Sequence, residues 1–104
     1  MTRRITLEAA SAAYERQGLN PRAGVTLDLE KRCACPIAAL ALDAGAKEEP
    51  SQWADREYGP DYVIGFMCGF DGWCRSSLDD GEEEGFDDGE ALALALQPPG
   101  RLCL

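Results

Sequence analysis

The sequence predicts a single α+β domain over residues 1–104 that is predominantly helical, with about five helices and one short strand or hairpin. Two observations predict this class. An apolar share of 45% in 104 residues supports one core, and most apolar residues recur at helical spacing. The motif Gly-Phe-x-x-Gly occurs at 65–69 and again at 85–89, which places two glycines on one face of each of two helices. We therefore expect close packing between those helices.

The first helix is predicted from Thr6 to Gln17, because small and apolar side chains recur there at three- and four-residue intervals. Gly18 follows as a helix-ending glycine. Proline at position 21 prevents the helix from continuing. The segment is therefore expected to be an amphipathic helix with a defined end.

A short strand is predicted at residues 25–29, where three apolar side chains alternate with polar ones. A lone strand is unstable, so this segment needs a partner. The other alternating candidate is the end of the sequence, at Leu102 and Leu104, and a strand of a second chain is the alternative.

Two short helices are predicted in the middle of the chain. The segment from Pro36 to Ala44 is nearly all apolar, has proline in its first turn and is followed by Gly45. This composition indicates a helix that is buried on most sides. A polar linker then leads to a short helix that carries Trp53 and ends at Gly59.

The last two helices are predicted at residues 60–70 and 80–96, and each contains one Gly-Phe-x-x-Gly motif. Residues 91–96 alternate as a strand does, but alanine and leucine are strong helix formers and favour the helix. We expect the two helices to form an antiparallel hairpin that meets through its glycine faces. Phe66 and Phe86 should then lie in or beside the core.

The charge of the chain is concentrated in its C-terminal part. Residues 1–60 hold 8 Lys/Arg and 9 Asp/Glu, whereas residues 61–104 hold 2 and 10. Direct nucleic-acid binding requires basic side chains that neutralise phosphates, so this distribution argues against it. A solvated helix face is one interpretation and an interaction surface for a basic partner is the other. The candidate interaction residues are Glu83, Glu84, Asp87, Asp88 and Glu90.

The segment Cys33-Ala34-Cys35-Pro36 is the most chemically suggestive one. If a helix begins at Pro36, Cys35 lies at its N-cap, where free N–H groups and the helix dipole lower the pKa of a thiol. Such a thiolate could attack an electrophile, bind metal or exchange a disulfide with Cys33, whereas plain burial of a small apolar side chain is the alternative. The chain has no histidine, which excludes Cys-His and Ser-His-Asp arrangements.

Two metal sites can be considered from the sequence. Cys33, Cys35, Cys68 and Cys74 could supply four thiolates to zinc, although their spacings differ from the Cys-x(2–4)-Cys pairs of structural zinc sites. A calcium loop would use the acidic run that begins at Asp79. No register of that run places glycine at the sixth position and glutamate at the twelfth, so an EF-hand is disfavoured.

The segment from Trp53 to Trp73 contains six aromatic residues, counting both tryptophans. Within it, Tyr62, Phe66 and Phe70 recur every four residues. This spacing predicts an aromatic row along one edge of a helix. A hydrophobic core is the first interpretation of the row. A groove for a peptide or a helix is the alternative.

Four segments of the chain, at 14–21, 33–40, 62–72 and 85–89, are similar to short bacterial proteins of unknown function that are numerous in planctomycete-like genomes. The shared motifs are CxCPIxAL and YVxGFxxGFDG, and the resemblance spans most of residues 5–96. It implies a small, standalone cytosolic protein with an accessory or regulatory role. It implies no activity, cofactor, partner or functional residue.

Three functions follow as hypotheses. The first is a non-enzymatic interaction or regulatory module that uses the acidic or aromatic face to bind a protein partner, or a second copy of itself as a homodimer. The second is a small zinc-binding protein, and the third is a thiol redox protein that uses Cys33 and Cys35. We expect a cytoplasmic protein, since the sequence has no apolar segment of about 20 residues to cross a membrane and no apolar signal peptide at its start.

Overall fold

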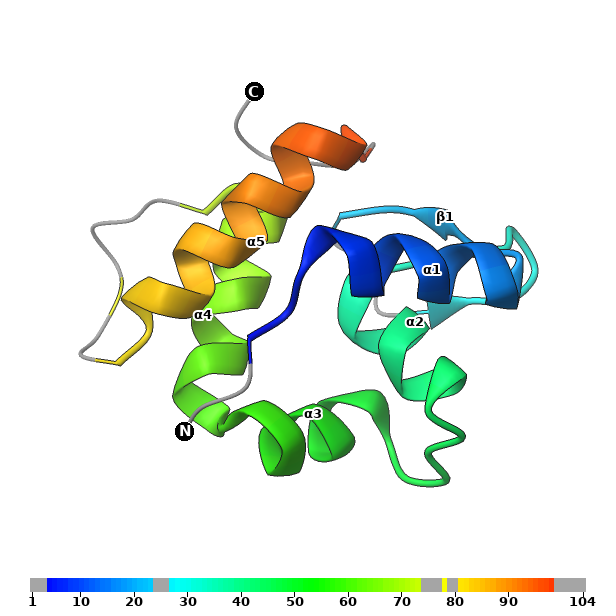
Figure 1. Cartoon of the computed structure of the whole chain (residues 1–104), viewed down its shortest axis with the longest axis horizontal. Coiled ribbons are helices and arrows are strands. Elements are labelled where there is room, and N and C mark those ends of the chain that lie inside the picture. The colour runs from blue at the N-terminus through cyan, green and yellow to red at the C-terminus, as the bar shows by residue number, and fades with distance from the viewer. Residues whose placement is uncertain (1–3, 24–26, 74–77, 79–80, 99–104) are drawn as a thin grey trace.

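The computed structural model describes residues 4–23, 27–73, 78 and 81–98. The predicted class, α+β and predominantly helical, is confirmed. Over the described residues the chain forms five helices and three short strands (Figure 1), in the order α1 (Leu7–Gln17), β1 (Asn20–Pro21), β2 (Leu27–Asp28), β3 (Cys33–Ala34), α2 (Pro36–Asp43), α3 (Pro50–Tyr58), α4 (Pro60–Asp71) and α5 (Glu83–Leu96).

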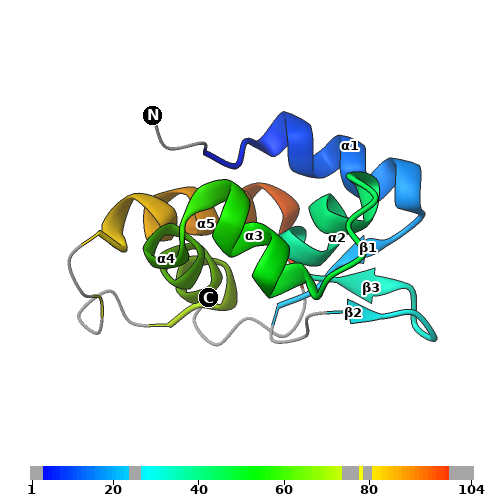
Figure 2. The same ribbon diagram turned by 90° about the horizontal axis from the view of Figure 1, so that it is seen from below.

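The helices divide the molecule into two ends. Figure 2 shows α1, α2 and the strands at one end, and α4 and α5 at the other. Helix α2 packs against both α1 and α3, and α3 packs in turn against α4. Residues 36–41 of α2 are all buried, so this apolar helix is the centre of its end, as its composition predicts. None of the described helices combines the length and the apolar character that crossing a membrane requires.

Helix α1 begins and ends close to the predicted positions. Thr6 is its N-cap, and the Thr6 hydroxyl accepts a hydrogen bond of 3.1 Å from the amide of Ala9. Gly18 has φ = 65° and ends the helix, after which the amide of Leu19 donates to the carbonyl of Tyr14 at 3.0 Å. The amide of Gly18 also donates to the carbonyl of Glu15, at 3.3 Å. This pair of bonds is typical of a Schellman ending, for which glycine is the favoured residue.

Of the predicted strand at 25–29, Leu27 and Asp28 form β2, Leu29 lies in the turn that follows, and residues 25–26 lie outside the described residues. It pairs antiparallel with β3, with Leu27 opposite Ala34 and Asp28 opposite Cys33. Strand β1 pairs in parallel on the other side of β3, so the sheet order is β1-β3-β2. The partner of the predicted strand is therefore the cysteine segment of the same chain. The end of the sequence, the other predicted partner, lies outside the described residues.

Helices α4 and α5 touch backbone to backbone. A methyl group added to Gly65 would lie 1.9 Å from the carbonyl oxygen of Glu82, and one added to Gly69 would lie 2.3 Å from that of Phe86. Both distances are far shorter than any real carbon–oxygen contact. The two α4 glycines therefore allow α5 to approach closer than any side chain would permit.

The contact is reciprocal. A methyl group on Gly85 would lie 2.0 Å from the carbonyl oxygen of Tyr62, and one on Gly89 would lie 2.1 Å from that of Phe66. Each glycine thus faces the carbonyl group that lies three residues before a glycine of the other helix. The predicted packing through the two Gly-Phe-x-x-Gly faces is confirmed.

The two helices run parallel, so the predicted antiparallel hairpin is wrong. Moving from Gly65 to Gly69 on α4 moves the contact forward along α5, from Glu82 to Phe86. Residues 72–82 connect the helices, and eleven extended residues reach about 35 Å, which is enough to return along an α4 of about 18 Å. A glycine pair four residues apart has the same spacing in both directions, so the motif alone does not set the orientation.

The aromatic row is part of the core, as predicted. The rings of Tyr58, Tyr62, Phe66 and Phe70 stack in sequence, with successive centroids 5.9, 6.2 and 6.4 Å apart. Phe66 and Phe70 are fully buried, and the ring of Trp53 meets that of Tyr58 edge to face. The row therefore connects α3 to the α4–α5 pair.

Replacing Gly65 with alanine should destabilise the protein by about 2–4 kcal/mol, because the new methyl group would meet backbone that cannot move aside without separating the helices. Helix propensity alone predicts the opposite sign, a gain of about 0.5–1 kcal/mol. Urea unfolding measures the change, with Ile64→Ala at an exposed position of α4 as the control. A neutral or stabilised Gly65→Ala variant would contradict the close contact.

Candidate functional site

The parallel arrangement places the first turns of α4 and α5 beside one another, and a cleft of about 550 Å³ lies between them. We call it the acidic cleft. The residues that define it come from the end of α3, the first turns of α4 and α5 and the glycines that precede these turns: Tyr58, Gly59, Pro60, Asp61, Tyr62, Gly81, Glu83 and Glu84. The tyrosine side chains are buried and belong to the stacked row, so one wall of the cleft is part of the core.

The carboxylates of the acidic cleft have a structural cause. Asp61 lies in the first turn of α4, and Glu83 and Glu84 lie in the first turn of α5. Negative side chains there offset the positive end of each helix dipole. Gly81, with φ = 90°, brings the chain before α5 so close to Asp61 that an added methyl group would be 3.2 Å from its carboxylate. The same charges that stabilise the helix starts therefore face the cleft.

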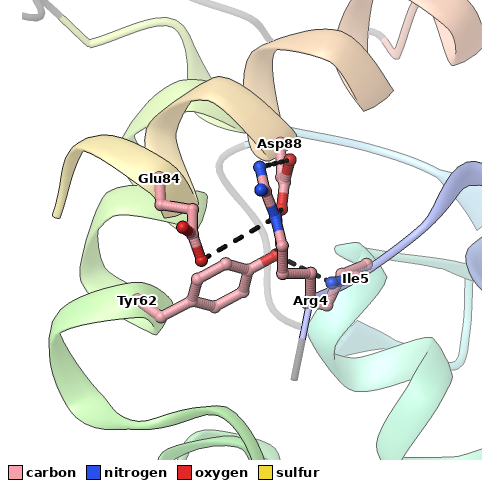
Figure 3. Close-up of polar contacts among 5 residues, drawn as sticks. All are labelled: Arg4, Ile5, Tyr62, Glu84 and Asp88. Atoms are coloured by element: carbon pink, nitrogen blue, oxygen red, sulfur yellow. Dashed lines mark hydrogen bonds and ion pairs between the residues drawn. The ribbon is translucent and has the colours of Figure 1, made fainter. Parts of the chain in front are cut away.

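Tyr62 connects the acidic cleft to the N-terminal segment (Figure 3). Its hydroxyl accepts a hydrogen bond of 2.7 Å from the amide of Ile5 and donates one of 2.5 Å to Oδ2 of Asp88. Ile5 and Tyr62 are each only 4% exposed. Burial, followed by the Asp88 carboxylate, raises the pKa of the Tyr62 hydroxyl, so the phenol stays protonated and remains a donor.

Arg4 binds the same aspartate from the solvent side (Figure 3). Its Nε donates to Oδ2 of Asp88 at 2.9 Å and its Nη2 donates to Oδ1 at 2.8 Å, which is a bidentate pair. Nε also lies 3.8 Å from a carboxylate oxygen of Glu84. The Arg4 side chain is 51% exposed and that of Asp88 is 17% exposed. The hydrogen bond to Asp88, followed by its charge, raises the pKa of Arg4.

The five candidate interaction residues do not share one environment on α5. Glu83 and Glu84 line the acidic cleft, and Asp88 forms the contacts with Arg4 and Tyr62. Asp87 is exposed, whereas Glu90 is half-buried beside the α4 contact. Of these residues, the structure therefore gathers three around the start of α5.

Sequence reasoning missed three contributors to the site. Asp61 sits at the start of α4, where a search for acidic residues at predicted helix starts would have found it. The Tyr62 hydroxyl appeared only as one member of an aromatic row. Arg4 has no local signal, because it is separated from Asp88 by 84 residues.

The cysteines of the predicted zinc site lie on three different elements. Cys33 is buried on β3, Cys35 is buried at the N-cap of α2, and Cys68 is half-buried on α4; all three are free thiols. Cys74 lies outside the described residues. Among the residues that the structure describes, no group of three histidine, cysteine or acidic side chains is arranged to hold a metal ion. The four-cysteine site includes Cys74 and stays a prediction.

Cys35 is the N-cap of α2, as predicted, but the expected lowering of its pKa is wrong. Burial raises the pKa of the Cys35 thiol to about 11. The amide groups of Ala38 and Ile37 lower that pKa, yet the cost of burying a thiolate is larger. The thiol is therefore protonated near neutral pH, which is unsuited to a nucleophile.

The Tyr62→Phe variant should lose about 1–3 kcal/mol of stability, because the buried amide of Ile5 would have no acceptor. Urea unfolding measures the loss, and hydrogen exchange localises it. The Ile5 amide should exchange faster, while the Ala10 amide, which donates to the carbonyl of Thr6 within α1, should keep its rate. Unchanged stability together with unchanged Ile5 exchange would contradict the role given to the hydroxyl.

Cys35 should react with iodoacetamide at pH 8 about 100-fold more slowly than an unhindered thiol, because a pKa near 11 leaves about one thiol in a thousand ionised. Peptide mass spectrometry after timed quenching measures the rate. The urea-unfolded protein is the control and should be labelled at the ordinary rate. Equal labelling of Cys35 in the folded and unfolded protein would contradict its protected state.

Comparison of the chain with protein families, curated proteins and solved structures gives no match. The resemblance to planctomycete-type proteins therefore stays a prediction, and the function proposed next is inferred from the geometry of the chain itself.

Proposed function

We propose that the protein is a non-enzymatic interaction module that binds a basic segment of a protein partner at the acidic cleft and the adjoining start of α5. The observation that carries this proposal is the guanidinium of Arg4, which is held by Asp88 and lies 3.8 Å from Glu84. The surface thus already binds one arginine side chain of its own chain. The same chemistry would recognise arginine or lysine side chains of another protein.

The shape and charge of the acidic cleft support a cationic ligand. Asp61, Glu83 and Glu84 supply carboxylates, while Tyr58 and Pro60 supply apolar surface. A long basic side chain pairs its charged end with carboxylates and packs its methylene stem on apolar atoms. Arginine should bind better than lysine, because its planar fork can form two parallel bonds to one carboxylate.

The overall charge distribution supports the same type of partner. The excess of acidic residues lies in residues 61–104, which include most of α4 and all of α5. A concentrated negative field increases the rate at which a basic protein arrives and repels nucleic acid. We place this function in the cytoplasm, where the free thiols of Cys33, Cys35 and Cys68 would stay reduced.

A fluorescein-labelled oligoarginine peptide of about nine residues should bind the full-length protein, with an affinity that falls as NaCl rises from about 20 to 300 mM. Fluorescence anisotropy measures the affinity. An oligolysine peptide of equal length should bind more weakly. The double variant Glu83→Gln/Glu84→Gln should lose about tenfold in affinity, since both carboxylates line the acidic cleft.

The matched control is Glu15→Gln/Glu30→Gln, which removes the same charge from two exposed positions outside the acidic cleft. It should change the affinity less than about twofold. An equal loss in both double variants would mean that the peptide senses net charge only, and would contradict a localised site. No binding at low salt would contradict the proposed function altogether.

A further inference from the structure

Arg4 occupies two carboxylates that an incoming basic side chain would need. Glu84 lines the acidic cleft, and Asp88 lies one helical turn further along α5. The guanidinium of Arg4 pairs with both of them, through two bonds to Asp88 and the longer ion pair to Glu84. A basic partner at the start of α5 would therefore compete with the Arg4 side chain for the same oxygen atoms.

The N-terminal segment is built so that the side chain of Arg4 can leave while the segment stays in place. Ile5 is buried, and its amide is bonded to Tyr62, so the next residue anchors the backbone. The Arg4 side chain is half exposed, and its charged end is bonded to Asp88. Because half of the Arg4 side chain faces water, solvent can hydrate its guanidinium when it leaves the carboxylates.

The carboxylate of Asp88 is oriented so that it could accept a second guanidinium in place of that of Arg4. Its Oδ2 accepts a hydrogen bond from the Tyr62 hydroxyl, a contact that does not involve Arg4 and that would orient the carboxylate after Arg4 has left. Oδ1 is the oxygen to which Arg4 Nη2 donates. Departure of Arg4 thus exposes a fixed carboxylate with one face free to accept a bidentate ligand.

We propose that Arg4 is an autoinhibitory contact, an internal competitor that covers Glu84 and Asp88 until a basic partner displaces it. This inference rests on the proposed function, because it assumes that the partner binds through basic side chains. The apparent affinity of such a site is the intrinsic affinity multiplied by the fraction of molecules in which Arg4 is displaced. Removing Arg4 should therefore strengthen binding.

The test compares Arg4→Gln with Arg16→Gln in the full-length protein, using the oligoarginine peptide and anisotropy at low salt. Arg16 is a matched control, because it forms a bidentate pair with Asp43 on another face, with a similarly exposed side chain. Arg4→Gln should bind the peptide about three- to tenfold more tightly than wild type, and Arg16→Gln should change it less than about twofold. Arg4→Lys, which keeps the charge without the fork, should be intermediate.

The outcomes separate the two proposals. Equal affinity gains in Arg4→Gln and Arg16→Gln, or no gain in either, would overturn the role of Arg4. In both cases, binding of the peptide by the wild type would still support the proposed function. Absence of binding in all variants overturns both. Hydrogen exchange of the Ile5 amide should be the same in Arg4→Gln and wild type, and faster exchange would mean that the variant has released the whole segment, which also contradicts the anchored competitor.

Discussion

The direct contact between the backbones of α4 and α5 is the constraint on which the rest of the molecule depends. With no Cβ atom at Gly65, Gly69, Gly85 or Gly89, each helix lies against carbonyl groups of the other. At this distance Cα–H groups can donate weakly to carbonyl oxygens, and dispersion contacts are dense. Because each glycine meets one particular carbonyl, the contact fixes the register of the two helices along their axes as well as the distance between them. The first turns of both helices are consequently level with each other, and the acidic cleft lies between them.

This parallel pairing has an electrostatic consequence that explains where the acidic residues are. Two helices that start side by side place their positive dipole ends together, which is unfavourable unless negative charge lies nearby. Asp61, Glu83 and Glu84 supply that charge, whereas neither helix has a basic residue in its last turn. The surplus of carboxylates is thus partly a requirement of the fold. Arg4 pairs with one of these carboxylates, Glu84, and with Asp88 one helical turn further along α5.

Those parts of the structure that depend on local patterns could be predicted from the sequence, and those that depend on distant partners could not. Helix ends at Gly18 and Gly59, the aromatic row and the close glycine contact follow from spacing within a few residues. The direction of α5 relative to α4 does not follow from spacing, because a glycine pair has the same spacing in both directions. The residues that connect the two helices determine this direction. The Arg4–Asp88 pair joins residues that only the finished fold brings together. For Cys35, position predicted the N-cap, but the thiol pKa depends on burial by the whole chain.

Tyr62 links the packing of the core to the orientation of the Asp88 carboxylate on the acidic surface. Its ring stacks between those of Tyr58 and Phe66, its backbone carbonyl faces Gly85, and its hydroxyl joins Ile5 to Asp88. The carboxylate that Arg4 holds is therefore oriented by a residue whose own position is set by the helix contact. If the packed α4–α5 pair strengthens the binding of a ligand to this carboxylate, then binding of the ligand stabilises the packed pair by the same free energy. A ligand bound at the start of α5 would then increase the stability of the backbone contact between α4 and α5.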